Sequence, residues 1–176
     1  MEEELRGILS LESRQKIYDL LSSSPGLHFR EIQRRTGLAT GSLQYHLGYL
    51  EKKHLIRQVK EKKFSRFYLV REPFHEEKEM GALRQESSRK IILFLLQKKR
   101  GASNKQISKE IGLSPSTTSW HLDNLFEKGL LGKKRRGKKI IYSLVDPQKA
   151  ANILVSYKTS FFDEMVDNFV SVWEQI

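Results

Sequence analysis

Apolar residues recur every three or four positions within 13–56 and again within 88–131, the spacing of helices that bury one face. In the first stretch the pattern predicts three helices, with the second over 29–36 and the third over 40–53. The second stretch repeats the pattern, with its second and third helices over 104–111 and 115–128. Gly37 and Gly112 follow the two middle helices, as glycine does where a left-handed residue ends a helix.

The two stretches are copies of one another. Residues 13–56 align with residues 88–131 at a constant offset of 75 without a gap, and fourteen of forty-four positions are identical. Most of these positions are apolar or glycine, the types that fix a fold. Beyond Leu131 we expect the second copy to lose one residue, so that Tyr68 corresponds to Tyr142. The repeat indicates two domains of one fold.

The third helix of each copy has a buried face and an open one. Leu43, Leu47 and Leu50 fall within about 60° of one another at 100° per residue, so we expect them in the core. The positions 75 residues later form the same stripe. A helix, a tight glycine turn and a second helix make a helix-turn-helix, whose second helix can enter a major groove about 12 Å wide.

A basic run between strand-forming residues follows each third helix. The segment "KGLLGKKRRGKKIIYSL" (128–144) predicts strands over 129–133 and 138–145 that turn at Gly137, and the first copy predicts strands over 54–59 and 65–70. We interpret the tips, 60–66 and 133–139, as wings that contact phosphates while the third helix reads base edges. A solvated charge run or a nuclear targeting signal is the alternative.

Further helices are predicted around the two copies. The resulting domains are an N-terminal helix (1–12), a first winged helix (13–71), a connecting helix (72–87), a second winged helix (88–146) and one C-terminal amphipathic helix (147–176). The fold class is mainly α with small β-hairpins (α+β). Apolar residues of the last helix cover nearly half its circumference, more than a two-stranded seam needs. We expect it to pack within the chain, on the N-terminal helix or on a second copy. A cofactor or lipid pocket under Trp173 is a further alternative that no feature of the sequence supports.

Net charge of +11 is concentrated in the two copies. Residues 13–74 carry a net charge of +8 and residues 88–147 carry +10, whereas the segments before, between and after them are acidic. Two basic modules of this kind favour a polyanionic partner.

Other features exclude several classes of function. The chain has no cysteine and five histidines without close metal-ligand spacing, so we expect no disulfide, metal or cofactor. No apolar run approaches the roughly twenty residues that a bilayer requires, and the first residues are acidic where a secretory signal is basic. A cytoplasmic protein without a membrane partner is expected. It is not expected to be an enzyme, because no nucleophile with a base, phosphate loop or paired carboxylates were found.

The candidate DNA-contacting residues fall into two groups. On the recognition helices they are Thr40, Gln44, Tyr45, Tyr49, Ser116, Thr117, Ser119, Trp120 and Asn124. On the wings and at phosphate positions they are Arg30, Arg34, Lys60, Lys62, Lys63, Arg66, Lys105, Lys133, Lys134, Arg135, Arg136, Lys138 and Lys139, with Arg35 and Lys109 as further phosphate contacts. The candidates for packing or dimerisation are Phe161, Phe162, Met165, Phe169 and Trp173.

Two pairs of repeated residues allow two interpretations each. His46 and His121 lie at the edge of the buried stripe, which favours a structural, partly buried histidine over a ligand or catalytic group. Tyr45 and Trp120 share one outward position. They either contact a thymine methyl or sugar in the groove or pack on the wing.

Both copies resemble winged helix-turn-helix domains of the ArsR-like type. The resemblance rests on "SLQYHLGYLEKKHLI" and "TTSWHLDNLFEKGLL" at the third helices and on "SR" followed by isoleucine in the first helices, and it covers 13–71 and 88–146. Two such domains in one chain resemble the tandem winged-helix transcription regulators frequent in archaea. The resemblance implies double-stranded DNA as partner and a homodimer through terminal helices. The absence of cysteine excludes the family's thiolate metal sensing.

We therefore expect a sequence-specific DNA-binding transcription regulator, which could also contact the transcription machinery. Two alternatives stay open: a tandem winged-helix scaffold for protein interactions, and an RNA-binding or transcription-machinery module that does not read DNA sequence.

Overall fold

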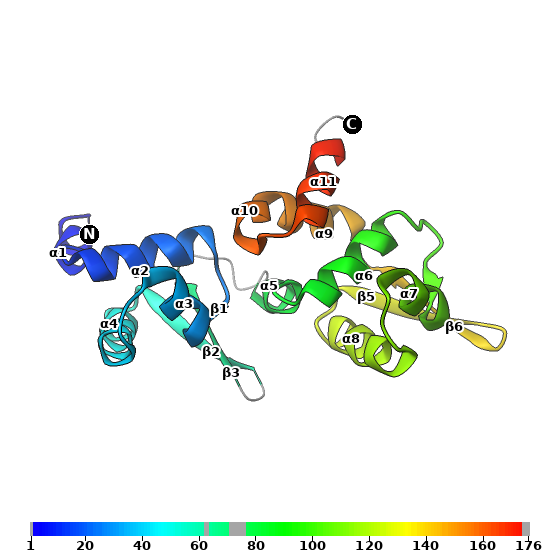
Figure 1. Ribbon diagram of the computed structural model, residues 1–176, viewed down its shortest axis with the longest axis horizontal. Coiled ribbons are helices and arrows are strands. Elements are labelled where there is room, and N and C mark those ends of the chain that lie inside the picture. Colours follow the sequence, from blue (N-terminus) through cyan, green and yellow to red (C-terminus); the bar gives the residue numbers. More distant parts are fainter. Residues whose placement is uncertain (1, 62–63, 71–76, 174–176) are drawn as a thin grey trace. The chain divides into compact units, whose positions relative to one another are not determined.

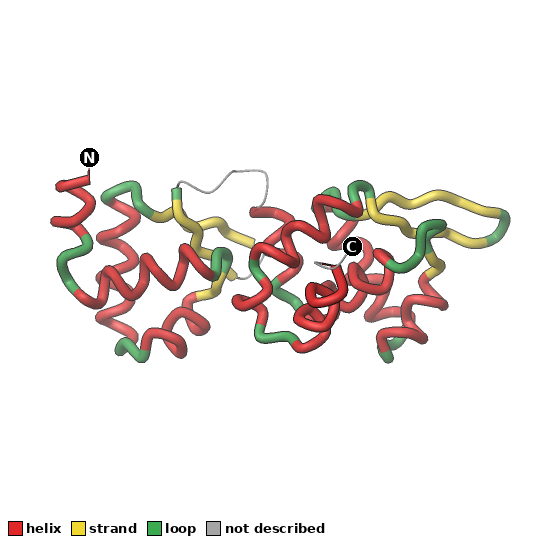
Figure 2. Tube along the Cα trace, turned by 90° about the horizontal axis from the view of Figure 1, so that it is seen from above, coloured by secondary structure: helices red, strands yellow, loops and turns green. Residues whose placement is uncertain are grey.

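The computed structural model describes residues 2–61, 64–70 and 77–173 of the chain. It divides into two compact units, Met1–Glu77 and Lys78–Ile176. Each unit has its own small antiparallel sheet with helices packed on it (Figures 1 and 2). The fold is the expected α+β arrangement of two winged helix-turn-helix domains in tandem.

The described part of the first unit contains four helices and three strands. The helices are α1 (Glu2–Ile8), α2 (Glu12–Ser23), α3 (Phe29–Thr36) and α4 (Thr40–Lys52). The strands are β1 (Leu27–His28), β2 (Ile56–Glu61) and β3 (Phe64–Leu69), which form a sheet in the order β1-β3-β2.

The second unit repeats this order and adds helices at its end. The repeated elements are α5 (Glu77–Leu83), α6 (Glu86–Leu96), β4 (Ala102–Ser103), α7 (Asn104–Ile111), α8 (Pro115–Glu127), β5 (Leu131–Arg136) and β6 (Lys139–Leu144). The sheet order is β4-β6-β5. The added helices are α9 (Pro147–Ser156), α10 (Lys158–Phe161) and α11 (Glu164–Trp173).

The offset of 75 residues between the two copies holds through both hairpins. The prediction that the second copy loses one residue beyond Leu131 is therefore wrong. Ile56 pairs with Leu69, and Leu131 pairs with Leu144, so the two registers correspond without a gap. Tyr142 is therefore the counterpart of Phe67: each pairs with the short first strand of its sheet. The expected match of Tyr68 with Tyr142 was wrong, because the buried ring at this position is a phenylalanine in the first copy and a tyrosine in the second, each 6% exposed.

The duplication also includes the helix that precedes each copy. Helix α5 lies 75 residues after α1, with the same seven-residue length. The segment expected to be a connecting helix over 72–87 is thus, in its described part, the first helix of the second unit and the start of α6. Met80 and Leu83 of α5 are fully buried. A repeated arginine links each pair of helices: Arg14 donates to the Ile8 carbonyl at 3.2 Å, and Arg89 donates to the Leu83 carbonyl at 2.9 Å.

The predicted core stripes are confirmed. Leu43, Leu47 and Leu50 of α4 are at most 4% exposed, and the corresponding residues of α8 are fully buried. The predicted ends of the middle helices are confirmed as well. Gly37 and Gly112 follow α3 and α7 with φ of +72° and +69°, a backbone conformation that is strained for residues with a Cβ.

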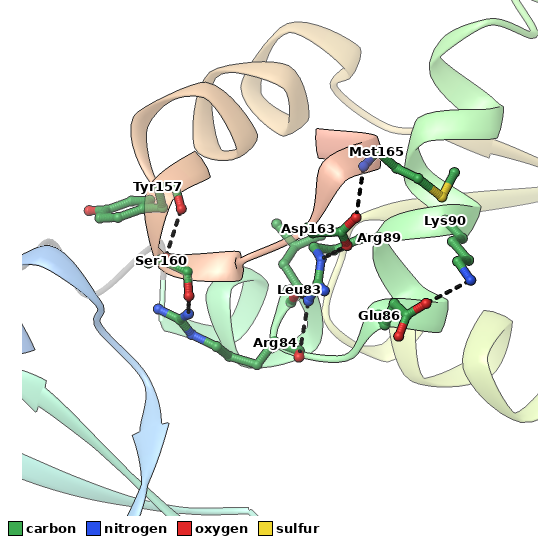
Figure 3. A network of polar contacts seen from close by, with 9 residues as sticks. All are labelled: Leu83, Arg84, Glu86, Arg89, Lys90, Tyr157, Ser160, Asp163 and Met165. Atoms are coloured by element: carbon green, nitrogen blue, oxygen red, sulfur yellow. Dashed lines mark hydrogen bonds and ion pairs between the residues drawn. The ribbon is translucent and has the colours of Figure 1, made fainter. Parts of the chain in front are cut away.

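The C-terminal segment is three helices rather than one. The chain turns at Phe162, whose φ is +50°, and Asp163 then caps α11 by accepting a hydrogen bond from the Met165 amide at 3.1 Å. The same carboxylate accepts a charged hydrogen bond from Arg89 Nε at 2.7 Å (Figure 3). Arg84 donates to the Ser160 carbonyl at 2.9 Å. These contacts hold the turn against α5 and α6, so a straight amphipathic helix cannot form.

Candidate nucleic-acid interface

Helix α4 presents a small, polar outer face. Gln44 and Tyr45 are exposed, Tyr45 to 62%, on the side away from the buried leucines. Thr40 is exposed, but its hydroxyl accepts a hydrogen bond from Gln33 Nε2 at 2.9 Å, which ties α4 to α3. Tyr49 is half-buried because the Arg14 guanidinium lies 3.7 Å from its ring centroid. Of the predicted α4 contacts, Tyr49 is therefore turned most toward the protein.

Helix α8 begins with a hydroxyl cluster. Ser114 is the N-cap: its Oγ accepts a hydrogen bond from the Thr117 amide at 3.1 Å and bonds with the Ser116 and Thr117 hydroxyls. Ser116 and Thr117 are exposed, and Trp120 one turn later is 50% exposed. The other two predicted contacts on α8 are half-buried; these are Ser119 and Asn124.

A histidine lies edge-on to each outward aromatic ring. Tyr45 and His46 have ring centroids 5.2 Å apart, and Trp120 and His121 have theirs 4.9 Å apart, both near-perpendicular. Burial lowers the pKa of His121, and burial together with the Arg14 charge lowers the pKa of His46. Both imidazoles are thereby favoured in the neutral form, as expected of structural histidines that orient the neighbouring ring.

The second unit carries an ordered hairpin with a strongly basic end. Strands β5 and β6 join at Gly137, whose φ of +60° permits the tight turn. Six side chains at this end are exposed: Lys133, Lys134, Arg135, Arg136, Lys138 and Lys139. Lys133 Nζ lies 4.2 Å from the Phe126 ring centroid, so the hairpin is tied to the last turn of α8. Sequence reasoning missed Phe126, although an apolar residue on the outer side of the helix end was a signal.

The corresponding hairpin of the first unit is less basic. Lys60 is exposed, while Lys62 and Lys63 lie outside the described residues. Arg66 is not on the surface, contrary to the prediction. It is 4% exposed and donates to the Gly26 carbonyl at 2.8 Å. Its side chain lies on the face of β3 opposite to the core residues Phe67 and Leu69, and the bond to Gly26 holds it there. Phe64, which was not among the predicted contacts, is 64% exposed where β3 begins.

The middle helices add further positive charge. Arg30 and Arg34 of α3, and Lys105 and Lys109 of α7, are exposed. Arg35 is half-buried instead, and it donates to Ser24 Oγ at 3.2 Å.

The C-terminal candidates separate into packed and exposed residues. Phe161 is 8% exposed and lies beside the guanidinium groups of Arg84 and Arg89. Phe162 and Met165 are exposed to 78% and 45%. The half-buried rings of Phe169 and Trp173 have centroids 5.4 Å apart.

The described residues offer neither a metal-binding cluster nor a membrane-spanning helix. Within 2–61, 64–70 and 77–173, no three His, Asp or Glu side chains gather in a way that could hold a metal ion. No helix in that part of the chain has the length and apolar character to cross a bilayer.

Comparison with known families matches each of the two copies to a helix-turn-helix family. Residues 11–83 match a family described as an N-terminal HTH domain, and residues 86–131 match one described as winged helix-turn-helix DNA-binding. The chain is therefore a tandem helix-turn-helix protein.

One relative and two solved structures are similar to parts of it. An uncharacterized HTH-type transcriptional regulator of Methanocaldococcus jannaschii is 29% identical over 137 residues, which cover 77% of this chain and 34% of the relative. The chain thus spans about a third of that relative's length. Reduced HlyU from Vibrio cholerae matches with a TM-score of 0.42 and 24% identity over 48% of this chain and 87% of its own. The mRNA-binding domain of elongation factor SelB from E. coli, solved in complex with SECIS RNA, matches with a TM-score of 0.31 and 16% identity, covering 77% and 98% of the two chains.

Proposed function

We propose that the chain is a sequence-specific, double-stranded DNA-binding transcription regulator that uses both units. The observation that carries the proposal is the contact between Lys133 and Phe126. It fixes an exposed basic hairpin to the helix whose outer face carries Ser116 and Trp120. A charged ribbon beside an exposed polar helix suits a duplex, which offers phosphates next to base edges.

The residues divide by the kind of contact that they can make. On α4 and α8 the exposed groups suited to base edges are Gln44, Tyr45, Ser116, Thr117 and Trp120: an amide pairs well with adenine, and an aromatic edge fits a thymine methyl. Phosphate contacts would come from the hairpin of the second unit, from Lys60 and from the basic residues of α3 and α7. Arg66 and Arg35 drop out of this set because they are bonded inside the first unit.

Asp123 favours one alternative, a scaffold for protein interactions. It is exposed on α8, where a carboxylate repels phosphate. Fourteen basic residues in 88–147 against four acidic ones outweigh a single carboxylate, so DNA binding stays the preferred function. Contact with the transcription machinery would then be additional to DNA binding.

A homodimer remains part of the proposal. Its support is the expected packing role of the C-terminal helices together with Phe162, a phenylalanine that is 78% exposed on the turn before α11. Replacing Phe162 with lysine should lower the mass measured by sedimentation if this side chain lies in a contact between copies.

The proposed function is tested by recovering genomic duplex fragments on the purified full chain and footprinting the enriched site. The proposal expects a protected segment with one shared sequence. Enrichment without a common sequence would reduce the function to non-specific binding, and preference for single strands or RNA over the duplex would replace it with the third alternative.

A further inference from the structure

A hollow of about 500 Å³ lies between α6 and α11 in the second unit. Its volume is in the range of small-molecule sites, about 300 to 1,000 Å³. Eight side chains line it: Leu93, Leu96, Gln97, Met165, Asn168, Phe169, Val172 and Trp173.

The hollow exists because α11 buries only one of its two apolar faces. Val166 and Val170 are fully buried, whereas Met165 and Val172, on the neighbouring face, are 45% and 61% exposed. The start of α11 is held in place by the Asp163 cap and its bond to Arg89, and Met165 follows directly (Figure 3). Helix α11, which forms one wall of the hollow, is therefore anchored at its N-terminal end by the buried Arg89–Asp163 ion pair.

The chemistry of the lining specifies the occupant. Six of the eight side chains are apolar, and the remaining two, Gln97 and Asn168, are amides without charge. A charged ligand would lose hydration here without gaining a partner. The Phe169–Trp173 ring pair offers a flat apolar surface, and the flexible side chain of Met165 can adapt to the shape of a ligand. Either amide can bond to one carbonyl, hydroxyl or amide group.

We propose that this α6–α11 hollow binds an uncharged, mostly apolar small molecule that carries one hydrogen-bonding group. The first unit has no such site, since its described residues contain no counterpart of α9, α10 and α11 after β3. The ligand would bind next to α6, which also packs on α7 and α8, and binding itself does not depend on the DNA-binding function.

The test uses the full chain and N-phenyl-1-naphthylamine, an uncharged fluorescent probe. The chain has two tryptophans, so Trp120→Phe leaves Trp173 as the sole donor for energy transfer to the probe. We expect saturable probe binding with quenching of Trp173 emission, and a rise in the unfolding midpoint as probe is added.

A matched pair of variants localises the binding. Val172→Lys places a charge in the hollow and should weaken probe binding about tenfold or more. Val145→Lys makes the same change at a residue that is 64% exposed outside the hollow, and should leave binding unchanged. Gln97→Leu should leave the affinity for the probe unchanged and lower the affinity for ligands that carry a carbonyl group. Absence of saturable binding, or equal effects of the two lysine variants, overturns the proposal. So does self-association that Val172→Lys abolishes while no probe binds, because a second copy would then occupy the hollow.

Discussion

Gly41 and Gly48 lie two turns apart on the outer side of α4. A Cβ added at either position would meet no atom within 4 Å, so packing inside the chain does not require glycine there. Glycine inside a helix costs about 1 kcal/mol relative to alanine. Close approach of a DNA surface to this face would explain why that cost is tolerated.

Replacing Gly48 with alanine should therefore have opposite effects on stability and binding. Unfolding in denaturant should show a gain of about 1 kcal/mol, while duplex affinity falls because the methyl group stands between Gln44 and the groove. Gly7→Ala on α1, which is equally open, is the control and should leave DNA affinity unchanged. Unchanged affinity in Gly48→Ala would remove this face of α4 from the interface.

The half-buried His46 and the buried His121 predict how stability depends on pH. Their pKa values are lowered below the ordinary 6.5 by burial, and for His46 also by the Arg14 charge. The folded chain then binds fewer protons than the unfolded chain, so stability is full above pH 6.5 and falls as the pH drops below it. Denaturant midpoints measured from pH 7.5 to 5 should fall less in the double variant His46→Gln, His121→Gln than in the natural chain. Equal slopes would contradict the assignment.

Single residues show where sequence reasoning stopped. The spacing of Leu43, Leu47 and Leu50 was enough to place them in the core, because the three side chains lie on one face of a single helix and no tertiary contact is needed to group them. Arg66 was misplaced, because a tertiary contact keeps it from the surface: it is 4% exposed and donates to the carbonyl of Gly26, forty residues earlier in the chain. The charge of a residue does not reveal such a long-range bond.

At the scale of elements, a buried ion pair fixes the C-terminal helices. The Arg89 and Asp163 side chains are 7% and 8% exposed, with Nε and Oδ2 2.7 Å apart. The corresponding arginine of the first unit, Arg14, stacks on Tyr49 instead. The same repeated residue thus stabilises different neighbours in the two units.

Removing one member of this pair should be costly. Asp163→Ala leaves a buried guanidinium without its carboxylate and should lower the stability of the second unit by about 3 to 5 kcal/mol, measured by denaturant unfolding. The double variant Arg89→Met, Asp163→Leu should recover part of the loss, because it removes the unpaired charge but also the α11 cap and the bond to the Leu83 carbonyl. A cost below about 1 kcal/mol for Asp163→Ala would mean that the pair is open to water.

Elements with local signals were predicted well, and those defined by tertiary contacts were not. The ends of α3 and α7 were predicted from their glycine stops, and the structure also begins both helices with a capping box, His28–Glu31 and Ser103–Gln106. Helix α5 was read as a connector, because its likeness to α1 is confined to positions such as Leu5 and Met80. The break at Phe162 is accompanied by contacts of its neighbours Phe161 and Asp163 with Arg89, which no local pattern encodes.

At the scale of the whole molecule, the chain is a duplication whose copies have diverged. The second unit has the strongly basic hairpin and the added helices with their hollow, while the first has the glycine-containing helix α4. This difference suggests unequal contributions to DNA binding, with more phosphate contacts in the second unit.

The most direct test of the central claim is the salt dependence of binding of the full chain to its recovered duplex. Six to ten phosphate contacts predict that log affinity falls with log salt at a slope of about −5 to −9. Replacing Lys134, Arg135 and Arg136 with alanine should make the slope shallower by about 3. Removing three charges elsewhere in the second unit, at the exposed Lys98, Lys99 and Arg100, should change it less. A flat salt dependence, or equal effects of the two triple variants, would contradict a hairpin that grips the DNA backbone.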